Sequence, residues 1–162
     1  MTAPESSPAD GSSEALLARR YRRLFDQDLV GIYRSDPERG GVLVACNRAI
    51  ADMFGYDAPE QMEGTRAGDF YRGGAEDREE AMRDLRERGE LVEYDLEMER
   101  RDGSPIWVLV HSKLVDDPED GRVVEGMMVD VTERVRTRRE LAERERRFRE
   151  MAETIEEVFW LR

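Results

Sequence analysis

Apolar and polar residues alternate along the second half of the chain. Within the segment 91–100, apolar residues at 92, 94, 96 and 98 alternate with acidic residues at 93, 95, 97 and 99, a period of two that is typical of a strand with one buried face. Asp102-Gly103 then marks a hairpin turn before a longer apolar run at 105–115. A third run covers residues 122–131, after a turn rich in aspartate. The pattern predicts three consecutive antiparallel strands.

The first half of the chain predicts two short strands and several small helices. Residues 29–33 and 42–46 are apolar runs separated by glycines, which indicates a hairpin. Asn47 is a suitable cap for a helix that Gly55 ends. Further helical segments are predicted at 57–60, 67–70 and 75–88. Strands followed by helices and then by strands indicate an α+β fold, with the helices on one face of an antiparallel sheet.

The two ends of the chain differ from this central part. Residues 1–13 are rich in Ser, Pro, Ala and Gly and are predicted to be a disordered tail. Residues 14–27 form a predicted flanking helix, 28–132 the core, 133–153 a linker helix, and 154–162 the start of a further domain. Both helices carry a thin apolar stripe, from which we predict a homodimer held by Leu17, Tyr21, Leu24, Leu141 and Phe148. A solvated linker helix is the alternative interpretation of residues 133–153.

Five short motifs occur in order along the chain. They are Leu29-Val-Gly-Ile-Tyr33, Val44-Ala-Cys-Asn47 through Met53-Phe-Gly-Tyr56, Glu63-Gly64, Arg101-Asp-Gly-Ser-Pro-Ile-Trp107, and Gly126-Met-Met-Val-Asp-Val-Thr-Glu-Arg134. In this order and spacing they resemble a PAS domain of the sensory-box type. The resemblance implies a five-stranded antiparallel sheet with small helices on one face and flanking helices at both ends. It also implies a longer multi-PAS signalling parent, such as a sensor histidine kinase.

The resemblance further implies an interior pocket between the helices and the sheet. Its expected lining residues are Phe54, Tyr56, Phe70, Tyr94, Met98 and Trp107. Ordinary core packing is the alternative role for these side chains. Arg66 and Arg72 either present a guanidinium to a carboxylate ligand or lie on the surface. A cavity above about 300 Å³ with converging polar groups would favour a ligand sensor, and a solid core would favour a spacer.

Asp130 and Thr132 end the last predicted strand and begin the linker helix. A carboxylate and a hydroxyl at this point can satisfy the free N–H groups of the helix, and we predict that Thr132 caps it. The carboxylate of Asp130 can in addition pair with an arginine. In PAS proteins this motif couples the core to an output helix, so the resemblance implies that both residues transmit a signal.

The sequence contains little that would support catalysis or cofactor chemistry. Cys46 is the only cysteine and His111 the only histidine. The segment that matches the cysteine motif of flavin-binding family members is 63–70 and has no cysteine, and the helix that carries the haem ligand in other members matches 75–89 and has no histidine. We therefore predict no flavin, no haem, no metal and no enzymatic activity. An unidentified small ligand is compatible with the sequence.

Charge and composition narrow the range of partners. The net charge is −12, and Lys113 is the only lysine among 26 basic residues. An acidic chain repels nucleic-acid phosphates, so we expect no DNA or RNA binding. A GC-rich genome and a high-salt cytoplasm both explain the preference for arginine and for acidic residues, and we favour the halophile. No apolar run reaches the length of a membrane helix, from which we predict a cytoplasmic segment without membrane contact.

The sequence as a whole predicts a sensory and signal-transmission module. It dimerises and couples a conformational change in its core to a C-terminal helix, with further PAS or kinase domains downstream as its partners. The alternative is an interaction or spacer module that binds no ligand.

Overall fold

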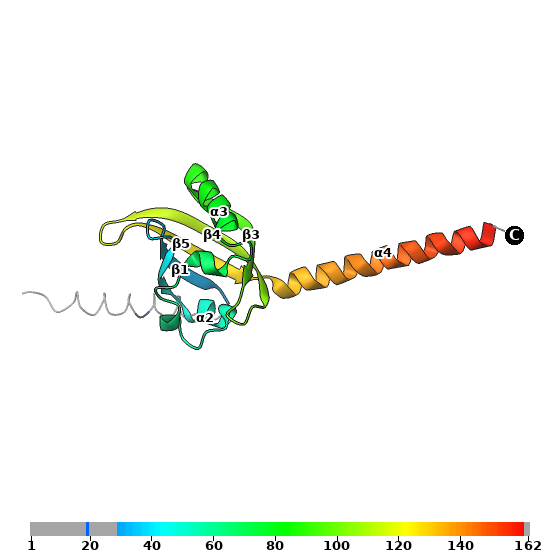
Figure 1. Ribbon diagram of the computed structural model, residues 1–162, viewed down its shortest axis with the longest axis horizontal. Coiled ribbons are helices and arrows are strands. Elements are labelled where there is room, and N and C mark those ends of the chain that lie inside the picture. The colour runs from blue at the N-terminus through cyan, green and yellow to red at the C-terminus, as the bar shows by residue number, and fades with distance from the viewer. Residues whose placement is uncertain (1–18, 20–28, 161–162) are drawn as a thin grey trace, which may run out of the picture.

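The computed structural model describes residues 19 and 29–160, with side chains up to residue 152. Five antiparallel strands form one sheet in the order β2-β1-β5-β4-β3. The strands are β1 (Gly31–Asp36), β2 (Val42–Cys46), β3 (Glu90–Glu99), β4 (Pro105–Asp117) and β5 (Gly121–Asp130). The predicted five-stranded antiparallel sheet is confirmed, and β5 lies at its centre between β1 and β4 (Figure 1).

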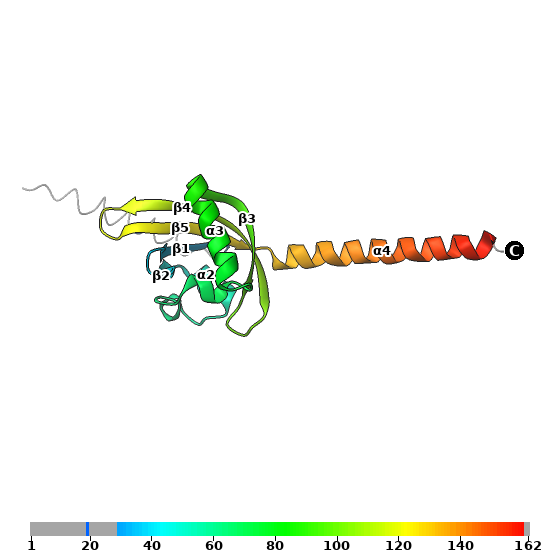
Figure 2. The same cartoon turned by 45° about the horizontal axis from the view of Figure 1, so that its top comes forward.

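Four short helical segments lie between β2 and β3, and one long helix follows β5. They are α2 (Arg48–Phe54), η1 (Pro59–Gln61), η2 (Ala67–Phe70), α3 (Ala75–Arg88) and α4 (Thr132–Trp160). Figure 2 shows α2 and α3 over the same face of the sheet, as predicted, while α4 projects away from it. The α+β architecture expected from the sequence is therefore confirmed.

Local sequence signals account for the helix boundaries. The side chain of Asn47 accepts a hydrogen bond from the backbone N–H of Ile50, which caps α2 as predicted. Gly55 and Gly89 follow α2 and α3 in the left-handed conformation, with φ of 79° and 81°. This conformation is costly for any residue with a Cβ, so each glycine ends its helix.

The core between the helices and the sheet consists of two clusters. The larger one joins α2 to the middle of the sheet through residues such as Ile50, Phe54 and Val108. The smaller one lies under α3. Tyr33 and Tyr71 pack against both clusters. On β5 a Cβ at Gly126 would lie 2.3 Å from the Tyr33 ring, so this glycine makes the room that the ring occupies.

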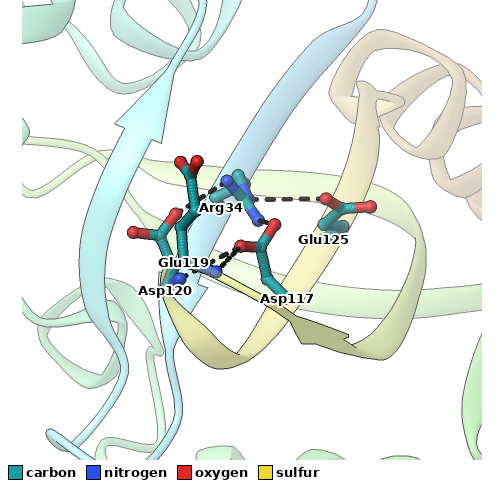
Figure 3. Close-up of polar contacts among 5 residues, drawn as sticks. All are labelled: Arg34, Asp117, Glu119, Asp120 and Glu125. Carbon is teal, nitrogen blue, oxygen red and sulfur yellow. Dashed lines mark hydrogen bonds and ion pairs between the residues drawn. The ribbon is translucent and has the colours of Figure 1, made fainter.

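A cluster of charged side chains holds the turn between β4 and β5, at the end of the sheet away from α4 (Figure 3). We call Arg34, Asp117, Asp120 and Glu125 the Arg34 cluster. The guanidinium of Arg34 lies 2.6 Å from Asp117, 3.0 Å from Asp120 and 3.4 Å from Glu125. The carboxylate of Asp117 also accepts hydrogen bonds from the backbone N–H groups of Glu119 and Asp120. The cluster thus ties β1 to both strands of the neighbouring hairpin.

The flanking segments are described only in part. Helix α4 continues to Trp160, beyond residue 153 where we expected the linker helix to end. Of the predicted N-terminal tail and helix at 1–27, only Arg19 is described, so Leu17, Tyr21 and Leu24 lie outside the described residues. Among the helices of the described region, none combines the length and the apolar character that crossing a membrane requires.

Candidate functional site

A cavity of about 70 Å³ lies between the helices and the inner face of the sheet. Its lining includes Tyr33 of β1 and Tyr71, the two residues at the border of the two core clusters. The volume is well below the roughly 300–1,000 Å³ of a pocket for a drug-sized ligand. It is nevertheless large enough for a few water molecules. The core is therefore neither solid nor hollowed to the extent that a large ligand requires.

Three of the six predicted lining residues lie on this cavity. Phe54, Phe70 and Met98 line its apolar part. The rings of Phe54 and Phe70 meet edge to face, with centroids 5.0 Å apart. Edge-to-face contact is a favourable geometry for two aromatic rings, so this wall of the cavity is well packed.

Tyr56, Tyr94 and Trp107 are absent from the cavity lining, and their prediction as pocket residues was wrong. Trp107 lies between the buried residues Ile106 and Val108, and alternation along β4 therefore turns it to the opposite face of the sheet. Tyr94 follows an irregularity in the pairing of β3 and packs against the smaller cluster. Tyr56 is not part of the lining, and its ring lies 6.2 Å from that of Phe70 in a T-shaped arrangement.

The other end of the cavity carries polar groups. Burial raises the pKa of Tyr33, and the neighbouring hydroxyl of Ser112 opposes this shift. Burial also raises the pKa of Tyr71, while the positive charge of Arg78 opposes this shift. Ser35 and Ser112 are both buried and line the same space. The cavity therefore has an apolar part and a polar part that remains uncharged except at Arg78.

The arginine on the cavity is Arg78, and neither predicted arginine lies there. Arg66 is exposed and not part of the lining, and Arg72 pairs with Glu97 at 2.7 Å. The sequence did contain a signal for Arg78. It precedes the buried Ala81 and Met82 by three and four residues, which places it on the inner face of α3.

A second group of polar contacts connects the sheet and α2 to the start of α4. We call Met53, Arg100, Trp107, Asp130 and Thr132 the α4 junction. One carboxylate oxygen of Asp130 accepts a hydrogen bond from the N–H of Thr132 at 2.8 Å, and the other accepts one from Arg100 at 3.1 Å. Arg100 donates a further hydrogen bond to the carbonyl of Met53, near the C-terminal end of α2. Arg100 is the arginine partner that the sequence suggested for Asp130 without identifying it.

Thr132 has a different role from the predicted one. Its hydroxyl accepts a hydrogen bond from the backbone N–H of Trp107 at 3.0 Å, and the residue is buried. The prediction that the Thr132 side chain caps α4 was therefore wrong. The sequence could not reveal this, because the partner is 25 residues away on β4. The carboxylate of Asp130 binds the first helical N–H instead, and Thr132 anchors the helix to the sheet.

The first turns of α4 also contact the outer face of the sheet. The guanidinium of Arg139 lies 4.8 Å from the centre of the Trp107 ring, within the range of a cation–π interaction. Farther along α4 the side chains lose contact with the domain. Leu141 is 58% exposed and Phe148 is 75% exposed, so the described part of the predicted dimer stripe is uncovered in the single chain.

Neither Cys46 nor His111 lines the cavity. Cys46 is buried at the end of β2, and burial raises the pKa of its thiol to about 11. A thiol with this pKa stays protonated at neutral pH and is a poor nucleophile. His111 is exposed on β4 next to the buried Val110 and Ser112, which places it on the sheet face away from the cavity.

The sheet, the helices on one of its faces and the helix that leaves its last strand define a PAS fold. The PAS domain family model matches residues 28–133, more than half of the chain. The chain belongs to the PAS domain family. No curated protein matches it in sequence.

Solved structures share the fold. An RNA-binding light-oxygen-voltage receptor is 25% identical over 88% of this chain with a TM-score of 0.65, and the match covers 40% of that receptor. A domain of a sensor histidine kinase/response regulator from Geobacter sulfurreducens is 24% identical over 72% of this chain and 96% of that domain, with a TM-score of 0.56. A PAS domain of a transcriptional regulator from Burkholderia thailandensis, in complex with ethanol, is 19% identical over 69% of this chain and 97% of that one, with a TM-score of 0.56.

Proposed function

We propose that this PAS domain is a sensory and signal-transmission module that passes a conformational change from its core to α4. The observation that supports the proposal best is the position of Arg100. This one side chain holds both the carbonyl of Met53 on α2 and the carboxylate of Asp130 at the start of α4. A passive spacer has no need for such a connection between the wall of a cavity and an output helix.

The route from the cavity to α4 is short. Ile50 and Phe54 of α2 line the cavity, and Met53 belongs to the same helix. A change in the cavity that moves α2 also moves the Met53 carbonyl, and with it the hydrogen bond to Arg100. Arg100 in turn positions Asp130, which binds the first N–H of α4. Packed helices linked by hydrogen bonds are suited to pass small displacements of this kind.

The signal in this proposal is a small ligand, and we propose that the domain binds neither flavin nor haem. A cavity of about 70 Å³ leaves no room for a tricyclic or macrocyclic ring without large rearrangement. Segment 63–70 has no cysteine for a flavin adduct. The similar domain from Burkholderia thailandensis is in complex with ethanol, a molecule of suitable size. An absorption spectrum of the purified chain that lacks flavin and haem bands is the expected result.

We further propose a cytoplasmic homodimer within a longer sensor histidine kinase. The exposed Leu141 and Phe148 of α4 supply the described part of the dimer contact, and the helix predicted at 14–27 supplies the rest. The similarity to a sensor histidine kinase domain supports this kind of parent. The domain itself acts without catalysis and without nucleic acid, consistent with its net charge of −12.

The test compares two aspartates in the full-length parent. Asp130→Ala removes the carboxylate of the α4 junction, whereas Asp52→Ala removes one half of the exposed ion pair Arg48–Asp52 on α2. We expect D130A to abolish the difference in output between stimulated and unstimulated protein, and D52A to preserve it. A wild-type response in a folded D130A protein would contradict the proposal and leave Asp130 as a structural cap.

A further inference from the structure

We infer that the core cavity binds a short-chain monocarboxylate, with Arg78 as the group that binds its carboxylate. The inference rests on the proposed sensory function and adds the chemical class of the ligand. Arg78 reaches the cavity from the inner face of α3. It is the only charged residue in the lining formed by the described residues, which contains no aspartate or glutamate.

The lack of a partner for Arg78 is unexpected in so acidic a chain. The protein has 38 acidic residues against 26 basic ones. Arg34, Arg72 and Arg100 each bind a carboxylate. In the described part of the chain, the guanidinium of Arg78 forms neither a hydrogen bond nor an ion pair with another side chain. A half-buried cation beside an apolar space is costly without a counter-ion, which indicates that the counter-ion comes from outside the chain.

Two glycines allow the Arg78 side chain to lie at the cavity. A Cβ at Gly41 would be 2.6 Å from a terminal nitrogen of Arg78, and a Cβ at Gly68 would be 3.3 Å from its Cδ. A larger residue at Gly41 would therefore push the guanidinium from its place. The glycines in the β1–β2 hairpin and in η2 thus leave the space that the Arg78 side chain occupies.

The polar groups around Arg78 suit a carboxylate. Tyr33, Tyr71 and Ser112 bring three hydroxyl groups to the lining, and Arg78 is near enough to Tyr71 to influence its ionisation. Within the described residues the Tyr71 hydroxyl has no hydrogen-bond partner. A carboxylate accepts several hydrogen bonds, and an arginine fork and a tyrosine hydroxyl can donate to its two oxygens together.

The rest of the cavity fixes the size and the character of the remaining part of the ligand. Apart from the polar groups, the wall consists of apolar residues such as Leu43, Ile50, Leu85 and Val110. A wall of this kind accepts a short alkyl group and rejects a second charge. The volume of about 70 Å³ admits only a few non-hydrogen atoms. Acetate and propionate meet these conditions, whereas dicarboxylates and long fatty acids do not.

The test uses propionate, with propionamide as an uncharged molecule of nearly the same shape. Both are titrated into the purified 162-residue chain by isothermal titration calorimetry, at constant ionic strength set with sodium chloride. We expect propionate to bind at least about tenfold more tightly than propionamide, since a charge-assisted hydrogen bond is stronger than a neutral one. The Arg78→Gln variant is expected to lose this preference. Arg83→Gln, an exposed arginine on the same helix, is the control and keeps it.

The outcomes separate the ligand class from the proposed function. Equal affinity for propionate and propionamide, or an unchanged preference in R78Q, would overturn the inference that Arg78 binds a carboxylate ligand. Absence of binding by both molecules would also overturn it. In each of these cases the comparison of D130A with D52A in the parent still decides whether the domain transmits a signal. A melting curve for R78Q shows that the variant is folded, and R78K, which keeps the charge without the fork, is expected to bind propionate with intermediate affinity.

Discussion

Arg34 and Arg100 both bind carboxylates on β5 or next to it, but the elements that they join differ. At the start of β5, Arg34 binds three acidic side chains, all on the β4–β5 hairpin. At its end, Arg100 binds one carboxylate and one carbonyl, and the carbonyl belongs to α2. The Arg34 cluster thus closes a turn within the sheet, whereas the α4 junction connects the sheet, the helical layer and the helix that leaves the domain (Figures 1 and 3).

This difference separates stabilisation from transmission. Strands that are hydrogen-bonded along their length move together. A side-chain contact between them therefore adds stability but transmits little relative motion. A helix that packs on a cavity can shift relative to the sheet. A hydrogen-bonded connection between that helix and the start of α4 transmits this shift to α4. Both the Arg34 cluster and the α4 junction contain an arginine, because its planar guanidinium can bind two oxygens at once.

The largest loss of stability is expected for Arg34→Ala. The substitution leaves Asp117, Asp120 and Glu125 close together without a cation, and their repulsion adds to the lost hydrogen bonds. Because these groups are partly exposed, we expect a decrease of about 2 kcal/mol in the free energy of unfolding. Urea denaturation measures it. An unchanged midpoint would mean that the cluster contributes nothing to stability.

A smaller loss is expected for Asp130→Ala. This variant loses the bond to the first N–H of α4 and the pair with Arg100, both of them partly exposed. We expect a decrease of about 1 kcal/mol, the usual cost of removing a helix cap. The same urea titration measures it. A loss larger than that of R34A would contradict the separation of the two roles.

The pH dependence of stability is expected to reveal the Arg34 cluster through Asp117. The backbone N–H groups of Asp120 and Glu119, followed by Arg34, lower the pKa of Asp117 to about 2. A carboxyl group with a lowered pKa stabilises the fold above its unfolded pKa of about 3.9, and this contribution is lost as the pH falls toward 2. The difference in unfolding free energy between wild type and Asp117→Asn should therefore be constant above about pH 5 and shrink below about pH 4. A constant difference down to pH 2 would contradict the lowered pKa.

The smallest effect on core stability is expected from charges placed on α4. The double variant Leu141→Glu and Phe148→Glu should leave the unfolding of the core unchanged, because both side chains are exposed. It should nevertheless shift the protein from dimer to monomer in light scattering, since the charges repel across the paired helices. Arg146→Glu, which places the same charge elsewhere on the helix, is the control and should remain dimeric. A dimer in the double variant would exclude this stripe as the dimer contact.

Local patterns in the sequence predicted most of the fold. Alternation gave the strands, and Asn47, Gly55 and Gly89 set helix ends through their own backbone preferences. The partners in contacts between distant parts of the chain could not be predicted from the sequence. The bond from Trp107 to Thr132 spans 25 residues and that from Arg100 to Asp130 spans 30, so the register of separate strands decides both.

The candidate cavity was predicted only in part for a related reason. The resemblance implied all six lining residues, and it was right for Phe54 and Phe70 in short helices but wrong for Trp107 on β4. Alternation along β4 places Trp107 on the outer face between the buried Ile106 and Val108, and the continuous apolar run of this strand hid that alternation from the sequence. Arg78 was not among the predicted residues, although its helical spacing from Ala81 and Met82 indicated the inner face of α3.

Amide hydrogen exchange can show whether Arg100 couples α2 to α4. Exchange is measured by mass spectrometry for wild type, Arg100→Gln and Asp117→Asn under identical conditions. We predict faster exchange in R100Q both at the end of α2 near Met53 and in the first turns of α4, with the β4–β5 turn unchanged. D117N should show the reverse, with faster exchange only at the turn. Unchanged exchange in α4 of a folded R100Q protein would contradict this coupling.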